Sequence, residues 1–384
     1  LRFPEFTEVW KDSNIGKCFD LYSGNTPSRM EKKHFIGDVN WITSGELKEH
    51  YIGDTKERIS EKAAEDNNLR ILPVGTFVMA IYGLEAEGVR GTCSITVKTS
   101  TISQACMAFT PKSNVSNEFL YSWYKKHGNK IGIRYAQGTK QQNLSYDIIE
   151  KFPIRYPSIE EQEKLNTFIS LLDKRIATQN KIIEDLKKLK VAIIEKVFSE
   201  KKCNYKIGDV ISQVSIRNKS KKETNILSVS NKWGFVEQSE QFEDRIVASE
   251  DITNYKVVRT NDFAYNPARI NVGSIARLKR YESGIVSPMY ICFHSQNALL
   301  PEYLELFFYT LYFKHEMYKR LEGSVRLCLS FEGLTNIPIF IPEITTQREI
   351  SIKVNSIETK IGIEETYLNA LKDQKQYLLK HMFI

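Results

Sequence analysis

Apolar residues recur in alternating steps of four and three along two stretches of the chain. In the first stretch the stripe consists of Leu165, Ile169, Leu172, Ile176, Ile183 and Leu186. In the second it consists of Ile350, Val354, Ile357, Ile361, Leu368 and Leu371. A sustained alternation of this kind is typical of a coiled coil, because a helix with so narrow an apolar face needs a partner helix. The pattern predicts two long helices that pair with each other through these residues.

The two stretches belong to a repeated segment. Shifted by 185 positions, residues 138–198 align with residues 323–383 without a gap, and 13 residues are identical. The identities include Gly138/Gly323, Leu144/Leu329, Pro153/Pro338, Pro157/Pro342, Gln162/Gln347 and Phe198/Phe383. The polar steps in the stripe recur as well, as Gln179 and Lys190 in one copy and Glu364 and Lys375 in the other. A repeat this long indicates a duplicated half-protein, with two similar domains related by a pseudo-two-fold axis.

The connection between the repeats favours antiparallel helices. At about 1.5 Å per residue, a helix over residues 161–198 would be roughly 57 Å long, more than one turn of B-DNA. Only residues 199–204 separate it from the second unit. This segment is too short for the return connection that parallel helices need, although the length of the second domain could also supply one. We therefore expect a first domain at 1–157, a long helix at 158–202, a second domain at 203–342 and a second long helix at 343–384.

The parts before each helix have a mixed pattern. Strand-like runs at residues 77–81, 94–97 and 284–286 alternate with turn signals and with helical stretches at 117–127 and 301–320. This predicts an α+β chain, with two similar α/β domains separated by the two helices of an antiparallel coiled coil. The two domains share short matches, such as residues 117–120 with 301–304, whereas their inserts differ.

Composition narrows the class of protein. The chain has 384 residues, of which 41% are hydrophobic and 26% charged, as in ordinary globular proteins. It contains no apolar run of about 18 residues, so we expect no membrane partner. The six cysteines are scattered without a CxxC pair, which favours reduced thiols and a cytoplasmic location. The first residues lack both a signal-peptide layout and a methionine, so we expect the natural start to lie upstream.

Basic and amide side chains gather in a few stretches of the domains. The net charge of +7 is a weak hint of a polyanionic partner. Lys and Arg neutralise phosphates, and Asn, Gln and Arg suit adenine and guanine edges. The candidate DNA-contacting residues are Thr43, Ser44, Lys125, Lys126, Arg134, Lys140, Gln141, Gln142, Asn143, Arg217, Lys219, Lys221, Asn266, Arg269, Asn271 and Arg326. A solvated basic face is the plain alternative for each stretch, and the interleaved aromatics Tyr121, Trp123, Tyr124 and Tyr135 are more typical of a core.

Catalytic signatures are missing from the sequence. There is no Walker A motif, no glycine-rich cofactor loop after a strand and no HExxH pair, since His315-Glu316 lacks a second histidine at 319. Asn266-Pro-Ala268 has only part of the Asn-Pro-Pro-aromatic motif of amino-methyltransferases. We therefore expect a binding module with no catalytic residue, no metal site and no cofactor of its own.

The ordered set of motifs resembles the DNA-specificity subunits of type I restriction–modification systems over the whole chain. The motifs are Leu1-Arg-Phe-Pro-Glu-Phe6 with Trp10, Ile15-Gly16, Ser23-Gly-Asn-Thr-Pro27, Asn40-Trp-Ile-Thr-Ser-Gly-Glu-Leu47, Gly138-Thr-Lys-Gln-Gln-Asn-Leu-Ser145, Phe152-Pro-Ile154, Glu161-Gln162 and Asp262-Phe-Ala-Tyr-Asn-Pro-Ala-Arg-Ile-Asn-Val-Gly-Ser274. The second copy of the 138–145 motif departs from the first, because it reads Gly323-Ser-Val-Arg-Leu-Cys-Leu-Ser330.

The resemblance implies a non-catalytic subunit. Each of two target-recognition domains would read one half of a split double-stranded DNA sequence, and the helices would set the gap and dock two methyltransferase subunits. Those partners would bind S-adenosylmethionine, and motor–nuclease subunits using ATP and Mg²⁺ would complete the complex. Two alternatives remain open: the trimmed specificity region of a fused restriction–methyltransferase enzyme, and a coiled-coil adaptor without DNA affinity.

Overall fold

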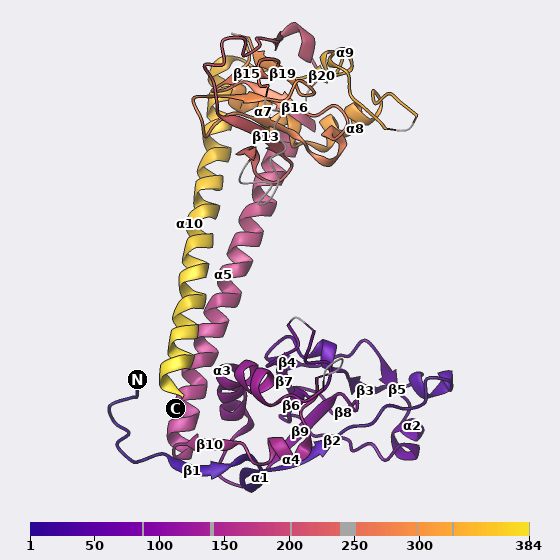
Figure 1. Ribbon diagram of the computed structural model, residues 1–384, viewed down its shortest axis with the longest axis vertical. Helices are drawn as coiled ribbons and strands as arrows, with labels where there is room; N and C mark the ends of the chain where they lie inside the picture. Colours follow the sequence, from indigo (N-terminus) through magenta and orange to yellow (C-terminus); the bar gives the residue numbers. More distant parts are fainter. Residues whose placement is uncertain are drawn as a thin grey trace. The chain divides into compact units, whose positions relative to one another are not determined.

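The protein is described here by a computed structural model that covers residues 1–86, 88–138, 142–199, 202–238, 251–296, 298–324 and 326–383. The chain divides into two compact units (Figure 1). Unit 1 comprises Leu1–Gln179 and Tyr367–Ile384, and unit 2 comprises Asn180–Thr366. Each unit therefore combines a globular part with a portion of both long helices.

The two long helices that the heptads predict are α5 (Ile159–Ser199) and α10 (Ile344–Met382). Each begins just after a proline, Pro157 or Pro342, whose ring disfavours a helical conformation in the residue before it. The first helix contains neither glycine nor proline, and the second contains one glycine, Gly362. Helix formation therefore meets no interior obstacle in α5 and only a weak one in α10.

The helices run antiparallel within each unit. In unit 1 Asp173 forms an ion pair with Lys375, and Arg175 donates to the hydroxyl of Tyr367. In unit 2 the Nζ of Lys187 lies 2.7 Å from Oε1 of Glu365, and the Nζ of Lys190 lies 3.3 Å from Oε2 of Glu358. In both units the residue numbers fall along α10 as they rise along α5, as the short connection between the repeats predicted.

The apolar stripe faces the partner helix or the globular core. Seven of its residues are buried: Leu165, Ile169, Ile183, Val354, Ile361, Leu368 and Leu371. The other five are half-buried: Leu172, Ile176, Leu186, Ile350 and Ile357. Of the polar steps, Gln179 is only 5% exposed, and the other three are half-buried.

Unit 1 builds its globular part from two sheets and a closing strand pair. The larger sheet has the strand order β2-β9-β6-β7-β4 and the smaller one β5-β3-β8, while β1 pairs with β10. The strands are β1 (Lys11–Asn14), β2 (Phe19–Ser23), β3 (Val39–Ile42), β4 (Tyr51–Ile52), β5 (Arg58–Ile59), β6 (Phe77–Ala80), β7 (Cys93–Thr96), β8 (Ser100–Ile102), β9 (Cys106–Pro111) and β10 (Pro153–Tyr156). The helices are α1 (Ile15–Cys18), α2 (Glu61–Asp66), α3 (Asn117–Tyr135) and α4 (Tyr146–Ile149).

Unit 2 has two four-stranded sheets, β12-β19-β16-β17 and β14-β13-β18-β15, and the strand pair β11-β20. The strands are β11 (Tyr205–Lys206), β12 (Ile211–Val214), β13 (Ile226–Ser230), β14 (Gly234–Glu237), β15 (Lys256–Arg259), β16 (Phe263–Tyr265), β17 (Ile275–Arg277), β18 (Ser283–Val286), β19 (Ile291–Ser295) and β20 (Pro338–Ile339). The helical stretch expected at 301–320 is two helices, α7 (Pro301–Phe308) and α8 (Leu311–Tyr318), and α9 (Phe331–Thr335) follows. The stretch breaks at Thr310 because its hydroxyl caps α8, accepting from the amide of Phe313 at 3.0 Å.

The duplication extends through the globular parts. The order β2-β9-β6-β7 in unit 1 matches β12-β19-β16-β17 in unit 2. In each unit one parallel pair lies in the other sheet, β3 with β8 and β13 with β18. Few residues repeat between these strands, because a buried strand requires apolar side chains of suitable volume rather than particular residues.

Each long helix starts against one globular part and ends against another. In unit 1 the amide of Gln162, at the start of α5, accepts from Ser116 N and donates to Asn114 O and Pro157 O. In unit 2 the amide of Gln347, at the start of α10, accepts from Leu300 N and donates to Ala298 O and Pro342 O. The identical glutamines of the repeat therefore make the same connection in both copies.

Phenylalanines fix the opposite ends of the helices. In unit 2 the ring of Phe198, near the end of α5, lies 5.0 Å from that of Tyr303 of α7. In unit 1 the ring of Phe383, just after α10, lies 5.4 Å from that of Phe119 of α3. Both phenylalanines are buried, so each globular core includes residues from the beginning of one long helix and the end of the other.

Candidate nucleic-acid interface

A tight hairpin carries the repeated Gly-containing motif in each unit. Gln137 bridges Asn143 in unit 1, and Glu322 bridges Cys328 in unit 2. Gly138 and Gly323 have φ angles of +110° and +114°, which side-chain-bearing residues rarely adopt. A Cβ at Gly323 would lie 2.4 Å from the carbonyl oxygen of Arg326, so the glycine is also required by space. The identity of the two glycines therefore reflects the shape of the turn.

In unit 1 this hairpin lies beside the loop after β6. Leu144 N donates to Ile81 O at 2.9 Å, and Leu84 N donates to Gln142 O at 3.0 Å. The guanidinium of Arg90 donates to the side-chain oxygen of Gln142 at 2.7 Å. The carboxylate of Glu85 accepts from Gln142 N at 2.8 Å, and this bond is the main cause of the lowered pKa of Glu85. Of the predicted residues in this motif, Gln142 and Asn143 are thus placed here, whereas Lys140 and Gln141 lie outside the described residues.

In unit 2 the corresponding hairpin lies beside the loop after β16. Leu329 N donates to Pro267 O at 3.1 Å, and the hydroxyl of Tyr265 donates to Leu329 O at 3.2 Å. The loop contains Asn266, Arg269 and Asn271, which are respectively buried, exposed and half-buried. Arg326, on the hairpin, is exposed. The fold therefore brings these four predicted DNA-contacting residues onto two adjoining loops.

A third segment completes the arrangement in each unit. In unit 2 it is the turn between β13 and β14, which contacts the end of the loop after β16. The hydroxyl of Ser274 donates to Val229 O at 3.0 Å, and a Cβ added at Gly273 would lie 3.7 Å from Cβ of Asn231. In unit 1 it is the segment after β3, which is linked through residues 103–105: Ser103 N donates to Ile42 O, and Ile81 N donates to Ala105 O. We call these three adjoining segments the loop corner of each unit. They are residues 42–47, 81–92 and 137–143 in unit 1, and 229–234, 266–273 and 322–328 in unit 2, except for the undescribed residues 87, 139–141 and 325.

The predicted residues Thr43 and Ser44 lie in the loop corner of unit 1. The hydroxyl and amide of Thr43 both donate to Oε2 of Glu46, at 2.7 and 2.9 Å, and close a capped turn. Thr43 therefore has a local structural role, and the half-buried Ser44 follows it. β3 and β13 are both paired in parallel with the equivalent strand, but Ser44 lies two residues after the end of β3, whereas Ser230 is the last residue of β13.

The predicted basic residues of α3 have different surroundings. Lys126 donates to the carbonyl oxygen of Phe383, and burial together with Lys130 and Lys380 lowers the pKa of its ammonium group. Lys125 is exposed, with its Nζ 5.6 Å from the ring centroid of Tyr121. Arg134 is exposed in the last turn of α3, near Gly132, whose added Cβ would lie 3.2 Å from Cγ of Arg90. Arg134 thus shortly precedes residues 137–143 of the loop corner in the chain, whereas Lys126 contacts Phe383, just after the second long helix.

The basic loop of unit 2 is held by a buried asparagine. Asn218 donates to Glu223 O at 2.7 Å and accepts from Glu223 N at 3.3 Å. Lys219 and Lys221 are exposed on this turn, and Arg217 donates to Asn254 O at 3.2 Å. These three predicted residues lie on a separate loop from the corner of unit 2.

The aromatic residues interleaved with the bases of α3 belong to the core. Tyr121, Trp123 and Tyr124 are at most 5% exposed, and only Tyr135 of this set is substantially exposed, at 41%. Trp10 and Trp41 are also buried, at 6% and 1%. Trp233, at the tip of the β13–β14 turn, is 71% exposed and was missed by the sequence-based selection. The signal available in the sequence was the position of Trp233 between Asn231-Lys232 and Gly234, which is typical of a hairpin turn.

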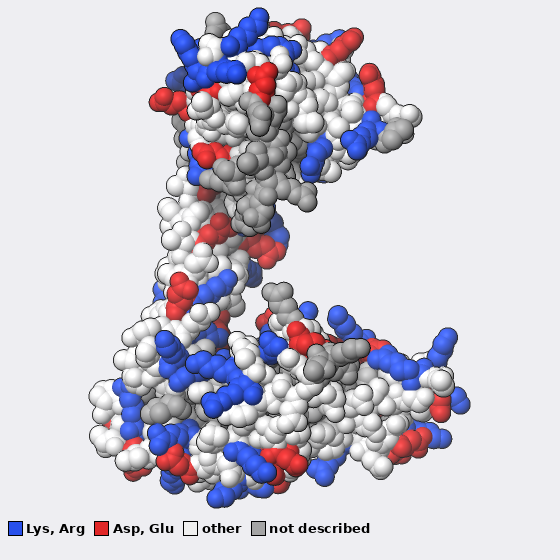
Figure 2. Space-filling view, in the orientation of Figure 1, with Lys and Arg blue, Asp and Glu red and all other residues white. Residues whose placement is uncertain are grey.

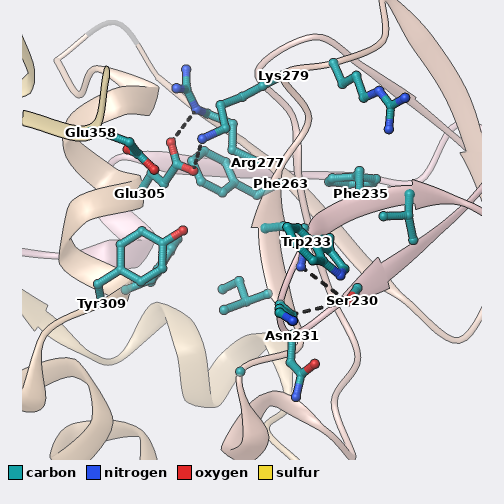
Figure 3. Close-up of a pocket in the computed structure, with 18 residues that line it drawn as sticks. Ser230, Asn231, Trp233, Phe235, Phe263, Arg277, Lys279, Glu305, Tyr309 and Glu358 are labelled. Carbon is teal, nitrogen blue, oxygen red and sulfur yellow. Dashed lines mark hydrogen bonds and ion pairs between the residues drawn. The ribbon is translucent and has the colours of Figure 1, made fainter. Parts of the chain in front are cut away.

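A cavity of about 820 Å³ lies beside this turn in unit 2. Trp233 and Phe235 line one side, and Tyr309 and the charged residues Arg277 and Glu305 line another (Figure 3). The carboxylate of Glu305 accepts from Nε of Arg277 at 3.0 Å and lies 2.8 Å from Nζ of Lys279. Arg277 and Glu305 are half-buried and Lys279 is exposed, and the ion pair between Arg277 and Glu305 holds α7 against β17.

Charges of both signs are spread over the surface of each unit. On the face shown in Figure 2, Lys and Arg side chains are interspersed with Asp and Glu in both units. In the parts of the chain that the structure describes, no group of three or more His, Cys, Asp and Glu residues could hold a metal ion. No helix among the described residues is both long and apolar enough to cross a membrane.

The sequence matches a known domain family over its first part. Residues 7–188 match the model of the type I restriction modification DNA specificity domain. Two curated relatives from Methanocaldococcus jannaschii are the type I restriction enzyme MjaIX specificity subunit, 29% identical over 201 residues, and the MjaVIII specificity subunit, 22% identical over 201 residues. These alignments cover 51% and 52% of this chain, respectively. They cover 45% and 44% of the relatives, so the chain spans about half the length of the curated relatives that it matches.

Solved structures share the fold of the whole chain. The S subunit of a type I restriction–modification system from M. genitalium has a TM-score of 0.58 at 15% identity, covering 100% of this chain and 98% of that one. The HsdS subunit of Thermoanaerobacter tengcongensis has a TM-score of 0.54 at 16% identity, with coverage of 100% and 98%. A chain from a study of assembly and conformational transition in the type I system has a TM-score of 0.61 at 15% identity, with coverage of 98% and 97%. Through the matched domain and its curated relatives, the chain is similar over about half of its length to the specificity subunits of type I restriction–modification systems.

Proposed function

We propose that the chain binds a bipartite double-stranded DNA target through the major groove, with each unit contacting one half-site. The observation that carries this proposal is the duplicated loop corner, which gathers polar and basic residues on the same three segments of two globular parts. Divergence between the corners suits two different half-sites, since Arg326 stands on one hairpin and Gln142 on the other. Exposed Arg269 and Arg326 have the fork geometry that suits guanine edges, and Asn271 has the amide that suits adenine.

The chain acts in this proposal as the non-catalytic subunit of a larger cytoplasmic complex. Two adenine-methyltransferase subunits would carry S-adenosylmethionine, and motor–nuclease subunits would use ATP and Mg²⁺. The long helices supply a docking surface, because several apolar side chains on them are exposed rather than in the stripe. In unit 2 they include Leu189, Val191, Ile352 and Ile363, which are 49–59% exposed. Exposed apolar side chains of this kind mark a candidate surface for a protein partner.

Methylation mapping tests the proposal. A host that expresses the chain with its methyltransferase partner should carry methylated adenines in a motif of two short blocks with a fixed gap. The complex should also bind that motif on duplex DNA with an affinity that falls steeply as salt rises, because phosphate contacts release counterions. A continuous motif, the absence of a new methylated motif, or a complex without affinity for DNA would contradict the proposal and favour the coiled-coil adaptor.

The genomic context decides between a separate subunit and a trimmed fused enzyme. A fused enzyme requires a methyltransferase reading frame continuous with the first codon of this chain. A separate methyltransferase gene supports the subunit that we propose. Sequencing the coding region upstream of residue 1 gives this answer directly.

A further inference from the structure

Trp233 is exposed in a way that sets it apart from the other tryptophans. Its side chain is 71% exposed, whereas Trp10, Trp41 and Trp123 are at most 6% exposed. Removing an indole from water is favourable in proportion to its large apolar area, so most tryptophans are largely buried. A single exposed tryptophan beside candidate DNA-contacting residues therefore points to a surface that is covered in a complex.

The turn that carries Trp233 has a defined structure. The hydroxyl of Ser230 accepts from the amides of Lys232 and Trp233, at 3.2 and 3.3 Å. Gly234 has a φ of +68°, which closes the turn and returns the chain into β14. Below the tip, the side chains of Val229 and Phe235 are each 5% exposed and anchor the hairpin in the core. The hairpin thus presents Asn231, Lys232 and Trp233 outward on a rigid two-stranded base.

The surroundings of Trp233 suit a nucleic acid. The Nζ of Lys232 lies 4.7 Å from the centroid of the indole ring, so a positive charge accompanies the apolar surface. The tip adjoins the loop that carries Arg269 and Asn271, because Asn231 lies next to Gly273. Two carboxylates line the nearby cavity, but each has a cationic partner: Glu305 has Arg277 and Lys279, and Glu358 has Lys190. The combination of exposed cations, amides and one indole is complementary to a base-paired groove rather than to an acidic or purely apolar protein surface.

We infer that the β13–β14 hairpin enters the major groove of the half-site contacted by unit 2, and that Trp233 packs on thymine methyl groups there. This inference rests on the proposed DNA binding and names one further specificity-determining residue. The major groove admits a two-stranded β-ribbon, and base stacking hides the faces of the bases in an intact duplex. The thymine C5-methyl is the apolar group that remains accessible on the groove floor. An indole at the tip of a ribbon has the matching surface.

Fluorescence of the full chain in complex with its methyltransferase partner gives the first test. Before DNA is added to this complex, iodide should quench the emission of Trp233, because the other three tryptophans of the chain are buried. Binding of duplex DNA that contains the methylated motif should protect this emission, and Trp233→Phe should remove the protected component. Emission that iodide quenches equally with and without bound DNA would overturn the inference.

Base substitution gives the second and more specific test. Trp233→Ala should weaken binding to the target duplex roughly five- to a hundredfold, the range of a lost base contact. Replacing one contacted thymine by deoxyuridine, which removes a single methyl group, should weaken wild-type binding about fourfold. The same replacement should leave binding by Trp233→Ala unchanged, while Trp233→Phe, which keeps an aromatic face, should retain the thymine dependence. Leu311→Ala is the matched control, since Leu311 is 69% exposed at the start of α8 and outside the loop corner.

The outcomes separate this inference from the proposed function. If the wild-type complex binds no duplex, the proposed function fails. If the wild-type complex binds DNA and Trp233→Ala binds equally well, only the role of Trp233 is overturned. Loss of affinity without any effect of deoxyuridine overturns the thymine contact, and loss of co-purification with the methyltransferase assigns Trp233 to a protein interface instead. A motif whose second block alone changes in Trp233→Ala, at a thymine position, supports the inference.

Discussion

At the scale of single residues, two buried glutamines show how strongly this fold depends on a few polar contacts. Gln162 and Gln347 are at most 1% exposed, and each satisfies three backbone groups at the junction of a long helix and a globular part. Backbone groups buried at such a junction need partners, since an unpaired one is costly. The sequence shows that both copies of the repeat have glutamine at this position, but it does not show which backbone groups the two side chains hydrogen-bond.

Replacing Gln347 by leucine should be strongly destabilising. The change leaves Leu300 N, Ala298 O and Pro342 O without their partner, at about 1–3 kcal/mol for each buried group that water does not reach. We expect the free energy of unfolding to fall by about 3 kcal/mol or more, measured by urea denaturation followed by circular dichroism. Gln376→Leu, at an exposed position of α10, is the control and should change stability little. Equal stability of both variants would show that the junction is satisfied in another way.

Burial of His127 should make the stability of unit 1 depend on pH. Burial, reinforced by the charges of Lys126 and Lys130, lowers the pKa of its imidazole from 6.5 to about 4. The native state therefore binds the proton less readily than the unfolded chain does, so stability should be full above about pH 6.5 and fall as the pH drops towards 4. His127→Gln should flatten this part of the pH profile of the melting temperature, whereas His381→Gln, at an exposed position, should keep the wild-type profile. Parallel profiles for wild type and His127→Gln would contradict this assignment.

At the scale of elements, the duplication also creates the ion pairs between the long helices. Asp173 and Glu358 are equivalent positions of the repeat, and so are Lys190 and Lys375. In unit 1 Lys375 pairs with Asp173, and in unit 2 Lys190 pairs with Glu358. The same contact between a lysine and a carboxylate thus occurs in both units. In each unit its lysine, Lys375 or Lys190, occupies a position of the otherwise apolar stripe. Polar residues within a coiled-coil stripe typically select register and orientation rather than add stability.

Exchanging the charges of one pair tests this register role. Lys190→Glu should place two carboxylates side by side and lower the free energy of unfolding by about 1 kcal/mol, because the pair is only partly shielded from water. The double variant Lys190→Glu/Glu358→Lys should recover most of the loss in a thermal double-mutant cycle. Lys187, which also pairs across the helices but is 57% exposed, is the matched position and should show a smaller coupling with Glu365. Additive effects of the two substitutions at 190 and 358 would contradict a specific contact.

At the scale of the whole molecule, the duplication links two similar globular folds through two shared helices. Each globular core contains residues from the start of one helix and the end of the other, such as Leu165 and Phe383 in unit 1. A change in one helix alone therefore disturbs the register of the pair, whereas a matched change in both keeps it. If the chain binds a bipartite DNA target as proposed, the length of the two helices should set the gap between the half-sites.

Removing one heptad from both long helices should change the gap of the methylated motif and leave its two blocks intact. The deletion keeps the antiparallel stripe in register, because it removes two turns from each helix. Long-read methylation mapping of a host that expresses the variant with its methyltransferase would measure the gap. Exchanging residues 204–342 for those of another specificity subunit is the companion experiment, and it should change one block only. An unchanged gap after the double deletion would exclude the helices as the element that sets it.

The pattern of the chain alone determined the parts of this protein that depend on local order. The heptads predicted α5 and α10, because an apolar stripe with a period of 3.5 residues can be buried only along a helix. The segment that recurs at an offset of 185 positions predicted the duplication, and the short connection at 199–204 favoured the antiparallel direction. Glycine identities at 138 and 323 marked a turn whose backbone requires a positive φ.

Tertiary structure alone decided which distant residues meet. Nothing in the local sequence placed Asn231 beside Gly273 or Leu329 beside Pro267, because tertiary folding joins segments that are far apart in the chain. It also separated residues of similar appearance: Lys126 contacts the end of α10, Tyr124 is buried in the core, and Trp233 stands exposed on a turn. Side-chain type sets what a residue can bind, but burial and neighbours set whether its groups are already satisfied. The candidate interface is therefore a property of the fold, built on elements that the sequence determined.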